Sequence, residues 1–184
     1  MNPWPDLRDI LRGIPWVVIG GVATRAYMPE RVTKDLDILV KKADGDEVIE
    51  RLQAAGYVIA SRLAVPGYLL RSPDGVEVDV LFGDTPWLTT ALQQPRRDPA
   101  GYPVLDLPYL VLMKLTAMRT QDWADVSRML GLASDEDLNA VRAVVARYSP
   151  ADSDDLESLI FLGKQELKPP PDQPTPQGGT QAAN

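Results

Sequence analysis

The acids in this chain whose spacing could support chemistry lie in two short alternating segments. In the first, Asp35–Lys41 (DLDILVK), Asp35 and Asp37 are two residues apart, so on a strand both side chains point to the same face. Two adjacent carboxylates repel each other, and a hard divalent cation such as Mg²⁺, which takes carboxylate oxygens and water as ligands, would offset this repulsion. The alternative is a solvated strand face on which the acids pair with nearby Arg or Lys.

The second alternating segment, Val76–Phe82 (VEVDVLF), places Glu77 and Asp79 on the face opposite its valines. If this strand lies beside the Asp35 strand, Asp79 completes a cluster of three carboxylates, and Glu77 lies further along the same face, at its edge. The alternative is an amphipathic hairpin, because the preceding residues Ser72-Pro73-Asp74-Gly75 are typical of a turn.

A pair of glycines, Gly20-Gly21, follows the apolar segment Pro15–Ile19 and precedes Val22–Met28, which has helical character. Glycines remove side chains, and the start of a helix offers unpaired N–H groups, so the backbone here could approach an anion closely. The alternative is that the pair only makes the turn from strand to helix.

Composition restricts the chemistry to carboxylates, hydroxyls, lysine, arginine, backbone amides and a hard metal. The 184 residues include no cysteine and no histidine, which excludes disulfides, thiolate sites, histidine zinc sites and Ser-His-Asp triads. The formal charge is −7, whereas a broad nucleic-acid-binding surface is normally strongly basic, so such a surface is disfavoured here. No segment approaches the roughly 20 apolar residues of a membrane span, and the N-terminus lacks a signal-peptide core, so we expect a cytoplasmic protein without membrane contacts.

Two kinds of sequence pattern divide the chain and define the elements that must position these residues. Short apolar or alternating segments, interrupted by helices, come first, and helical periodicity begins at Leu107. We therefore predict an α/β core over residues 1–105, a helical region over 106–163 and a disordered Pro/Gln/Gly-rich tail over 164–184. The predicted strands are Pro15–Ile19, Asp35–Lys41, Tyr57–Leu63, Tyr68–Arg71 and Val76–Phe82. The predicted helices are Asp6–Leu11, Val22–Met28, Glu47–Ala55, Thr85–Gln93, one through Tyr109 and Met118, one through Trp123 and Leu130, Asp135–Arg147 and Asp154–Leu162, with Pro95–Gly101 as a loop.

Together, the order and spacing of these features resemble the nucleotidyltransferase superfamily, whose fold is shared by DNA polymerase β and the aminoglycoside nucleotidyltransferases. The glycine pair precedes a helix, thirteen residues separate Gly21 from Asp35, and a single Asp follows on a later strand. The sequence is most similar to the branch that includes the AbiEii-type toxins, in which Arg-x-Thr-Lys-Asp-x-Asp is typical. The matching residues are Arg31, Thr33, Lys34, Asp35 and Asp37, and a typical later helical block is matched by Lys114, Arg119, Asp122 and Asp125.

The resemblance implies an α+β fold in which a mixed sheet flanked by helices is followed by a C-terminal helical bundle. It also implies transfer of a nucleoside monophosphate from an NTP to an acceptor hydroxyl, on RNA, protein or a small molecule, with release of pyrophosphate. Two Mg²⁺ ions about 3.5–4 Å apart, replaceable by Mn²⁺, would stabilise the attacking and leaving oxygens. The family's catalytic metal ligands correspond to Asp35, Asp37 and Asp79, and its phosphate-binding residues to Gly20, Gly21, Arg31, Lys34 and Lys114. A toxin role with an antitoxin partner follows from the resemblance alone.

Several of these residues also have plainer interpretations. Lys114 could be a surface lysine on an amphipathic helix, and Arg31 and Lys34 could pair with neighbouring acids. Asp122 and Asp125 could hold Lys114 or Arg119 in place through hydrogen bonds, but we favour the alternative that they stabilise the first turn of a helix begun near Thr120. The tryptophans favoured for packing rather than base stacking are Trp16, Trp87 and Trp123. For the whole chain, the alternatives are a non-catalytic nucleotide-sensing or protein-binding module on the same fold, and a scaffold that docks a partner through its tail.

Overall fold

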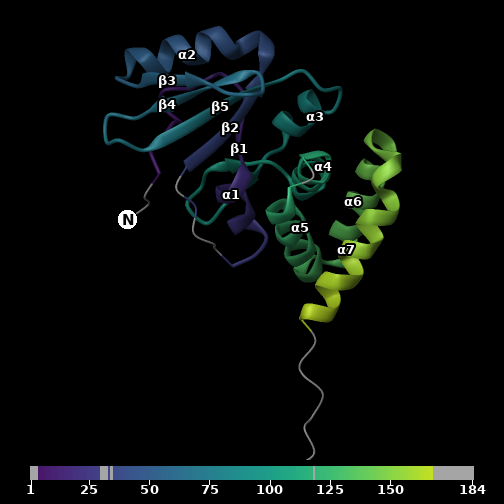
Figure 1. Ribbon diagram of the computed structural model, residues 1–184. Coiled ribbons are helices and arrows are strands. Elements are labelled where there is room, and N and C mark those ends of the chain that lie inside the picture. Colours follow the sequence, from purple (N-terminus) through teal and green to yellow (C-terminus); the bar gives the residue numbers. More distant parts are fainter. Residues whose placement is uncertain (1–3, 30–32, 34, 118, 168–184) are drawn as a thin grey trace, which may run out of the picture.

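A seven-stranded mixed sheet forms the centre of the computed structural model, which describes residues 4–29, 33, 35–117 and 119–167 (Figure 1). The strand order is β3-β4-β5-β2-β1-β7-β6. The strands are β1 (Trp16–Ile19), β2 (Asp35–Lys41), β3 (Val58–Arg62), β4 (Gly67–Arg71), β5 (Glu77–Gly83), β6 (Arg96–Arg97) and β7 (Pro103–Val104). The helices are α1 (Gly20–Ala23), α2 (Gly45–Ala54), α3 (Leu88–Gln93), α4 (Leu107–Ala117), α5 (Thr120–Leu132), α6 (Asp135–Tyr148) and α7 (Ser153–Glu166), with 3₁₀ turns at Thr24–Ala26, Lys42–Asp44 and Pro150–Asp152.

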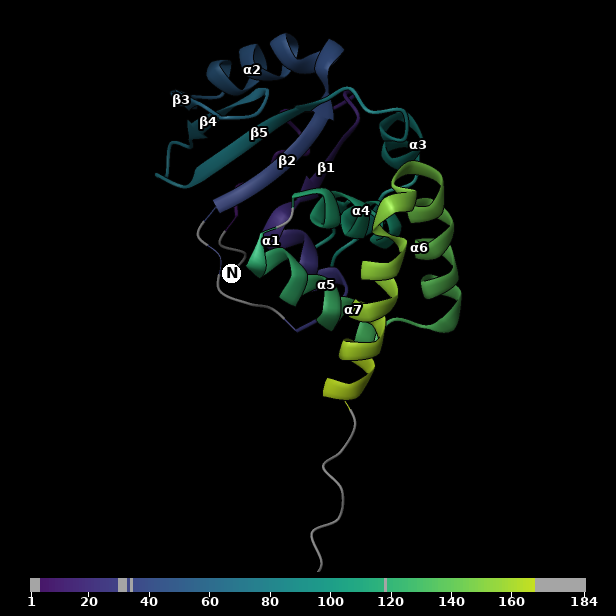
Figure 2. The ribbon, with the colours of Figure 1, turned by 45° about the vertical axis from the view of Figure 1, so that its right-hand side comes forward.

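Strands β2 and β5 lie side by side and parallel in the middle of the sheet. Their apolar residues alternate with acids, and one face of the pair is largely buried, with Leu36, Ile38 and Val80 at 0% exposure. Helix α2 covers this face, whereas α1 and α4 lie on the opposite face, toward which the acids point (Figures 1 and 2). The alternation therefore determines which side of the sheet is packed and which is polar.

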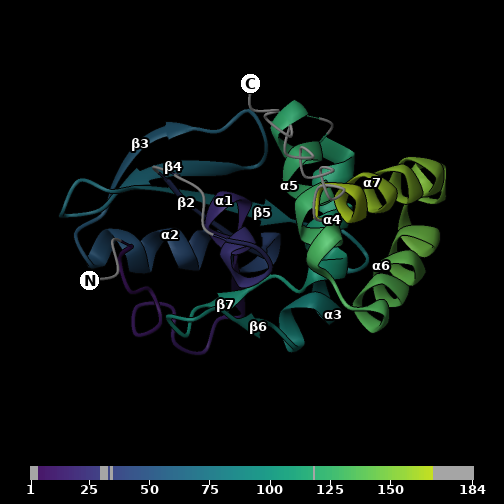
Figure 3. The same ribbon diagram turned by 90° about the horizontal axis from the view of Figure 1, so that it is seen from below.

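The C-terminal helices pack together beside the sheet (Figure 3). Helix α4 packs against α6, and α5 packs against α7. The α5–α7 contact is close because Gly131 and Gly163 face each other: a Cβ at Gly163 would lie 2.8 Å from the Gly131 nitrogen. Helix α6 begins with a capping box in which the Ser134 hydroxyl accepts from the Asp137 N–H at 3.1 Å. The mixed sheet followed by packed helices confirms the predicted fold class.

Three predicted elements near the N-terminus and around Pro86 are shorter than expected or differ in type. The segment Asp6–Leu11 forms turns rather than a helix, with Leu11 N–H donating to the Leu7 carbonyl at 2.9 Å, because it is too short to propagate between its flanking Pro5 and Gly13. The predicted helix over Val22–Met28 instead begins at Gly20 and tightens into a 3₁₀ turn after Ala23. The predicted helix Thr85–Gln93 begins only at Leu88, after Pro86.

Two further predictions, both in loop or tail regions, are corrected. The segment Pro95–Gly101, predicted as loop, contains the two-residue strand β6, which pairs with β7. Helix α7 continues to Glu166, so the first residues of the predicted tail are helical, and the Lys164 ammonium donates to the Ala133 carbonyl at 2.9 Å. The part of the predicted tail from residue 168 onward lies outside the described residues.

Candidate active site

Asp35 and Asp37 on β2 and Asp79 on β5 converge on one spot. Asp37 and Asp79 are register partners across the parallel pair, and one carboxylate oxygen from each of the three acids lies within 4.8 Å of the others. All three side chains are half-buried. Glu77 is not part of this cluster, because its carboxylate accepts from the Arg71 guanidinium at 3.1 Å. The condition set in the sequence analysis, that the two strands lie side by side, is therefore met, and the three acids point to the same face.

Burial and mutual repulsion make this cluster electrostatically unfavourable without a cation. Burial raises the pKa of the Asp37 carboxyl to about 7, and the nearby charges of Asp35 and Asp79 add to the rise. Burial likewise raises the pKa of Asp79, with further contributions from Asp35 and Glu77. Within the described part of the chain, no lysine or arginine forms an ion pair with any of the three acids. The cluster is therefore suited to a divalent cation, whose preferred ligands are carboxylate oxygens.

Gly20 lies directly against the cluster, and only glycine fits there. Its φ is +64°, and a Cβ would overlap the Asp37 carboxylate, with the Asp37 Cγ at 2.7 Å. The Thr24 hydroxyl donates to the Gly21 carbonyl at 2.8 Å and holds the turn that follows. The glycine pair thus makes room for a carboxylate as well as exposing backbone, a role that the sequence analysis did not identify.

A second polar cluster lies where α4 meets α5. The Lys114 ammonium, only 4% exposed, donates to Asp122 Oδ1 at 2.7 Å and to Asp125 Oδ2 at 2.8 Å. The Arg119 Nε donates to Asp122 Oδ2 at 2.5 Å, and the Arg119 side chain remains 73% exposed. The Gln121 amide donates to Asp125 Oδ1 at 3.0 Å, so both carboxylates are held in fixed orientations.

These contacts decide between the alternatives for the helical block. The interpretation of Lys114 as a surface lysine is wrong, because the side chain is buried and doubly paired. Asp122 does lie in the first turn of α5, but its carboxylate binds Lys114 and Arg119, and Asp125 lies beyond that turn. Burial alone would raise the pKa of Asp122, yet the hydrogen bonds from Arg119 and Lys114 outweigh it and hold that pKa below its usual value.

One cavity of about 760 Å³ joins the carboxylates, the glycine pair and the lysine. Among the described residues, four carboxylates and two cations line it, and these carboxylates would repel an anionic ligand unless further positive charge were present. Asp35 is additionally oriented by the Thr33 hydroxyl, which donates to its Oδ1 at 2.8 Å. The charged residues that line the cavity are Asp35, Asp37, Asp79, Asp122, Lys114 and Arg119. Arg31 and Lys34, predicted to contact phosphate, lie outside the described residues.

Two tryptophans pack as predicted, and the third is more exposed. Trp16 and Trp87 are buried, and Trp87 stacks on Tyr109 with ring centroids 5.5 Å apart. Trp123 on α5 is 39% exposed and lies away from the carboxylates, in a groove between α5 and α7. Among the residues that the structure describes, no tryptophan lines the cavity that holds the acids.

The sequence model of the family described as "Nucleotidyl transferase AbiEii toxin, Type IV TA system" matches residues 7–177. The chain belongs to the AbiEii nucleotidyltransferase family. This membership confirms the resemblance drawn from the glycine pair and the three carboxylates. No curated protein gives a significant sequence match. In the described part of this AbiEii family member, no helix combines the length and apolarity that crossing a membrane requires.

Solved structures with a similar chain course include two antibiotic adenylyltransferases. ANT(2")-Ia in complex with adenylyl-2"-tobramycin is 14% identical, with 88% of this chain and 95% of that chain covered and a TM-score of 0.46. The lincosamide antibiotic adenylyltransferase LnuA is 13% identical, with coverage of 76% and 90% and a TM-score of 0.42. Terminal uridylyl transferase 4 from Trypanosoma brucei is 10% identical, with coverage of 86% and 62% and a TM-score of 0.32.

Proposed function

We propose that this AbiEii family member transfers a nucleoside monophosphate from an NTP to an acceptor hydroxyl, with Mg²⁺ as cofactor and pyrophosphate as the second product. The observation that carries the proposal is the convergence of Asp35, Asp37 and Asp79, whose oxygens lie within 4.8 Å of one another in one cavity with the glycine pair. Such chemistry needs neither histidine nor cysteine, and the chain has none.

The donor set fits the metal that the family uses. Asp35, Asp37 and Asp79 supply hard oxygen ligands from two neighbouring strands, and burial together with the repulsion between the acids raises the pKa of Asp37 and of Asp79, which a bound cation would offset. When bound there, two Mg²⁺ ions, or Mn²⁺ in their place, supply the positive charge that stabilises the attacking and leaving oxygens of an in-line displacement. In our proposal Asp35, Asp37 and Asp79 would hold these ions, with Asp79 on the side of the acceptor.

The remaining groups position the nucleotide and move one proton. The backbone at Gly20 and Gly21 contacts the β and γ phosphates, because no side chain separates it from the cavity. The Lys114 ammonium can donate three hydrogen bonds, and its bonds to Asp122 and Asp125 leave one for a phosphate oxygen. Asp79, whose pKa is raised by burial, accepts the proton of the attacking hydroxyl.

Several parts of the proposal rest on the sequence and the family alone. Arg31 and Lys34 add contacts to the phosphates in this scheme. The acceptor hydroxyl belongs to RNA, protein or a small molecule, and the net charge of −7 disfavours an extended RNA surface. Membership in a type IV toxin–antitoxin family supports a toxin role with an antitoxin partner.

Labelled nucleotide transfer tests the proposal directly. The purified chain is incubated with Mg²⁺ and each labelled NTP in turn, together with total RNA, cell-extract protein or the small-molecule fraction, and both label transfer and pyrophosphate are measured. Asp37→Asn and Asp79→Asn are expected to lower transfer by at least about a hundredfold, because each removes a metal ligand. Glu77→Gln and Asp84→Asn serve as matched controls, since Glu77 pairs with Arg71 and Asp84 is exposed outside the cavity.

Two outcomes would contradict this assignment in different ways. If label transfer persisted in the double variant Asp35→Ala, Asp37→Ala, these two carboxylates would not be part of the active site. Tight NTP binding without Mg²⁺, with no pyrophosphate released for any acceptor fraction, would favour a non-catalytic nucleotide-sensing module on the same fold.

A further inference from the structure

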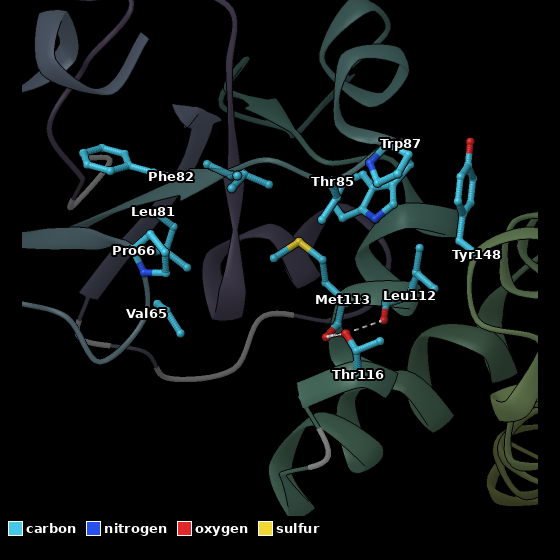
Figure 4. Close-up of a pocket in the computed structure, with 13 residues that line it drawn as sticks. Val65, Pro66, Leu81, Phe82, Thr85, Trp87, Leu112, Met113, Thr116 and Tyr148 are labelled. Carbon is cyan, nitrogen blue, oxygen red and sulfur yellow. Dashed lines mark hydrogen bonds between the residues drawn. The ribbon is translucent and has the colours of Figure 1, made fainter. Parts of the chain in front are cut away.

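A second cavity of about 530 Å³ adjoins the catalytic cavity. Val65, Leu81 and Met113 line both spaces, so the two are contiguous. Figure 4 shows Met113 extending from α4 toward Leu81 and Pro66, with Trp87 and Tyr148 further along the pocket. We call this second cavity the apolar pocket. Its volume lies within the roughly 300–1,000 Å³ that is usual for small-molecule sites.

The apolar pocket begins one side-chain step beyond the carboxylates on the same face of the sheet. In the parallel register, the pair Asp37/Asp79 is followed on this face by the pair Leu39/Leu81. Two residues along a strand span about 7 Å. The surface therefore changes from charged to apolar over a distance similar to the length of one ribose.

The lining of the apolar pocket is uncharged and largely aliphatic or aromatic. None of the described residues that line it is Asp, Glu, Lys or Arg, and the polar side-chain groups among them are the hydroxyls of Thr85, Thr116 and Tyr148 and the indole N–H of Trp87. The Thr116 hydroxyl already donates within α4, at 3.1 Å to the Leu112 carbonyl and 2.9 Å to the Met113 carbonyl. Such a pocket excludes phosphates and ammonium groups, because burying an unpaired charge there is costly.

One wall of the apolar pocket is fixed before any ligand binds. Trp87 is 8% exposed and stacks on Tyr109, with ring centroids 5.5 Å apart and an interplanar angle of 19°. Other walls come from β5, α4 and the end of α6, so the sheet and the C-terminal helices both contribute. A preformed apolar site bounded by aromatic side chains is suited to a planar ring.

We propose that the apolar pocket holds the nucleobase of the NTP substrate, an inference that rests on the proposed function. The phosphates occupy the charged cavity beside Gly20 and Gly21, and the α-phosphate lies at the three carboxylates. The base is the one uncharged planar part of the substrate, and the ribose keeps it within one sugar unit of the α-phosphate. The apolar pocket lies at that distance and is contiguous with the carboxylate cavity.

A variant that fills the apolar pocket separates the contribution of the base to NTP affinity from the contribution of the phosphates. Thr116 is exposed, so Thr116→Trp can place an indole in the pocket without disturbing the core. Thr90→Trp is the matched control, because Thr90 is an exposed threonine on α3 that does not line the pocket. Tyr148→Ala is the second variant and removes a wall instead of adding bulk. Calorimetry measures the binding of each NTP and of inorganic tripolyphosphate to the full chain with Mg²⁺.

The wild-type chain is expected to bind at least one NTP about tenfold or more tightly than tripolyphosphate, because the base adds contacts that tripolyphosphate cannot make. Thr116→Trp is expected to remove that difference by lowering NTP affinity about tenfold, with tripolyphosphate binding unchanged. Tyr148→Ala is expected to weaken NTP binding alone, by a smaller factor. Thr90→Trp is expected to match the wild type in both measurements.

Three results would overturn the inference, and they are distinguishable from one another. Wild-type NTP affinity and transfer in Thr116→Trp would show that the base lies elsewhere, while leaving the proposed function intact. If Thr116→Trp bound NTP as tightly as the wild type but transferred the nucleotide more slowly at saturating NTP, the apolar pocket would be the site of the acceptor. Absence of both NTP binding and label transfer in the wild type would instead contradict the proposed function on which the inference rests.

Discussion

Asp37 makes the metal-free protein less stable than its packing would allow, and this cost can be measured. Its pKa rises from an ordinary value of 3.8 to about 7, chiefly because the carboxyl is buried. A shift of about three units corresponds to about 4 kcal/mol of differential free energy. The folded state therefore binds this proton more tightly than the unfolded state does. The associated stability is present in full below pH ~4 and is lost as the pH rises through about 7.

The variant Asp37→Asn has no proton to lose at this position, so its stability should not show this decline. At about pH 8 and without metal, Asp37→Asn is expected to be more stable than the wild type by up to about 4 kcal/mol. For a chain of this length, that difference corresponds to a melting temperature higher by about 8–16 °C. The two proteins should converge near pH 4. Thermal unfolding in EDTA across this pH range, followed by circular dichroism, measures both curves.

The control for this experiment is Asp84→Asn, which removes the same charge from an exposed position next to β5. It is expected to track the wild type at every pH. Melting curves of the wild type and Asp37→Asn that differ by the same amount at pH 4 and pH 8 would refute the reasoning, because a buried, repelled carboxylate requires a difference that grows with pH. Saturating Mg²⁺ should raise the melting temperature of the wild type by more than that of the variant, since a bound cation relieves the repulsion.

Three further experiments probe the same region. Gly20→Ala is expected to abolish nucleotide transfer and to lower unfolding free energy by about 1–3 kcal/mol, because the new Cβ would meet the Asp37 carboxylate at an unfavourable φ; urea unfolding and label transfer measure both. Lys114→Met is expected to destabilise the chain by about 3–5 kcal/mol in urea, since it removes the buried ammonium that Asp122 and Asp125 share. Transfer activity is expected to be lost in EDTA and restored by Mg²⁺ or Mn²⁺ in a titration that monitors pyrophosphate.

Each of these expectations has its own contrary outcome. A Gly20→Ala protein with full transfer activity would show that the glycine is not required beside the carboxylate. A Lys114→Met protein as stable as the wild type would mean that its two acids find other partners. Activity that is undiminished in EDTA would argue against a metal-dependent reaction.

The alternation in Asp35–Lys41 and Val76–Phe82 was enough to predict two strands and the face of each that carries acids, because the opposite face had to be apolar throughout. That the two strands are parallel neighbours with Asp37 opposite Asp79 was only a condition in the sequence analysis. Register between segments forty residues apart depends on the whole sheet, and no local pattern encodes it.

The pairing of Lys114 with Asp122 and Asp125 was the less favoured of two interpretations in the sequence analysis, because no local pattern decides between them. Separations of 8 and 11 residues would not bring side chains together on one straight helix, and the contact exists because the chain turns between α4 and α5. The apolar pocket was missed for a related reason. Its lining comes from strands, helices and a hairpin loop that are scattered along the sequence, and each of its residues looks like ordinary core.

The close approach of α5 and α7 at Gly131 and Gly163 links the end of the described chain to the chemistry near its centre. Helix α5 carries the two acids that orient Lys114, and α7 is the helix that supports α5 on its other side. A shortened version of this protein that stopped after α6 would keep every proposed metal ligand and yet lose the support for its lysine. The smallest unit able to hold the complete site therefore extends to the last helix, well beyond the sheet that carries the acids.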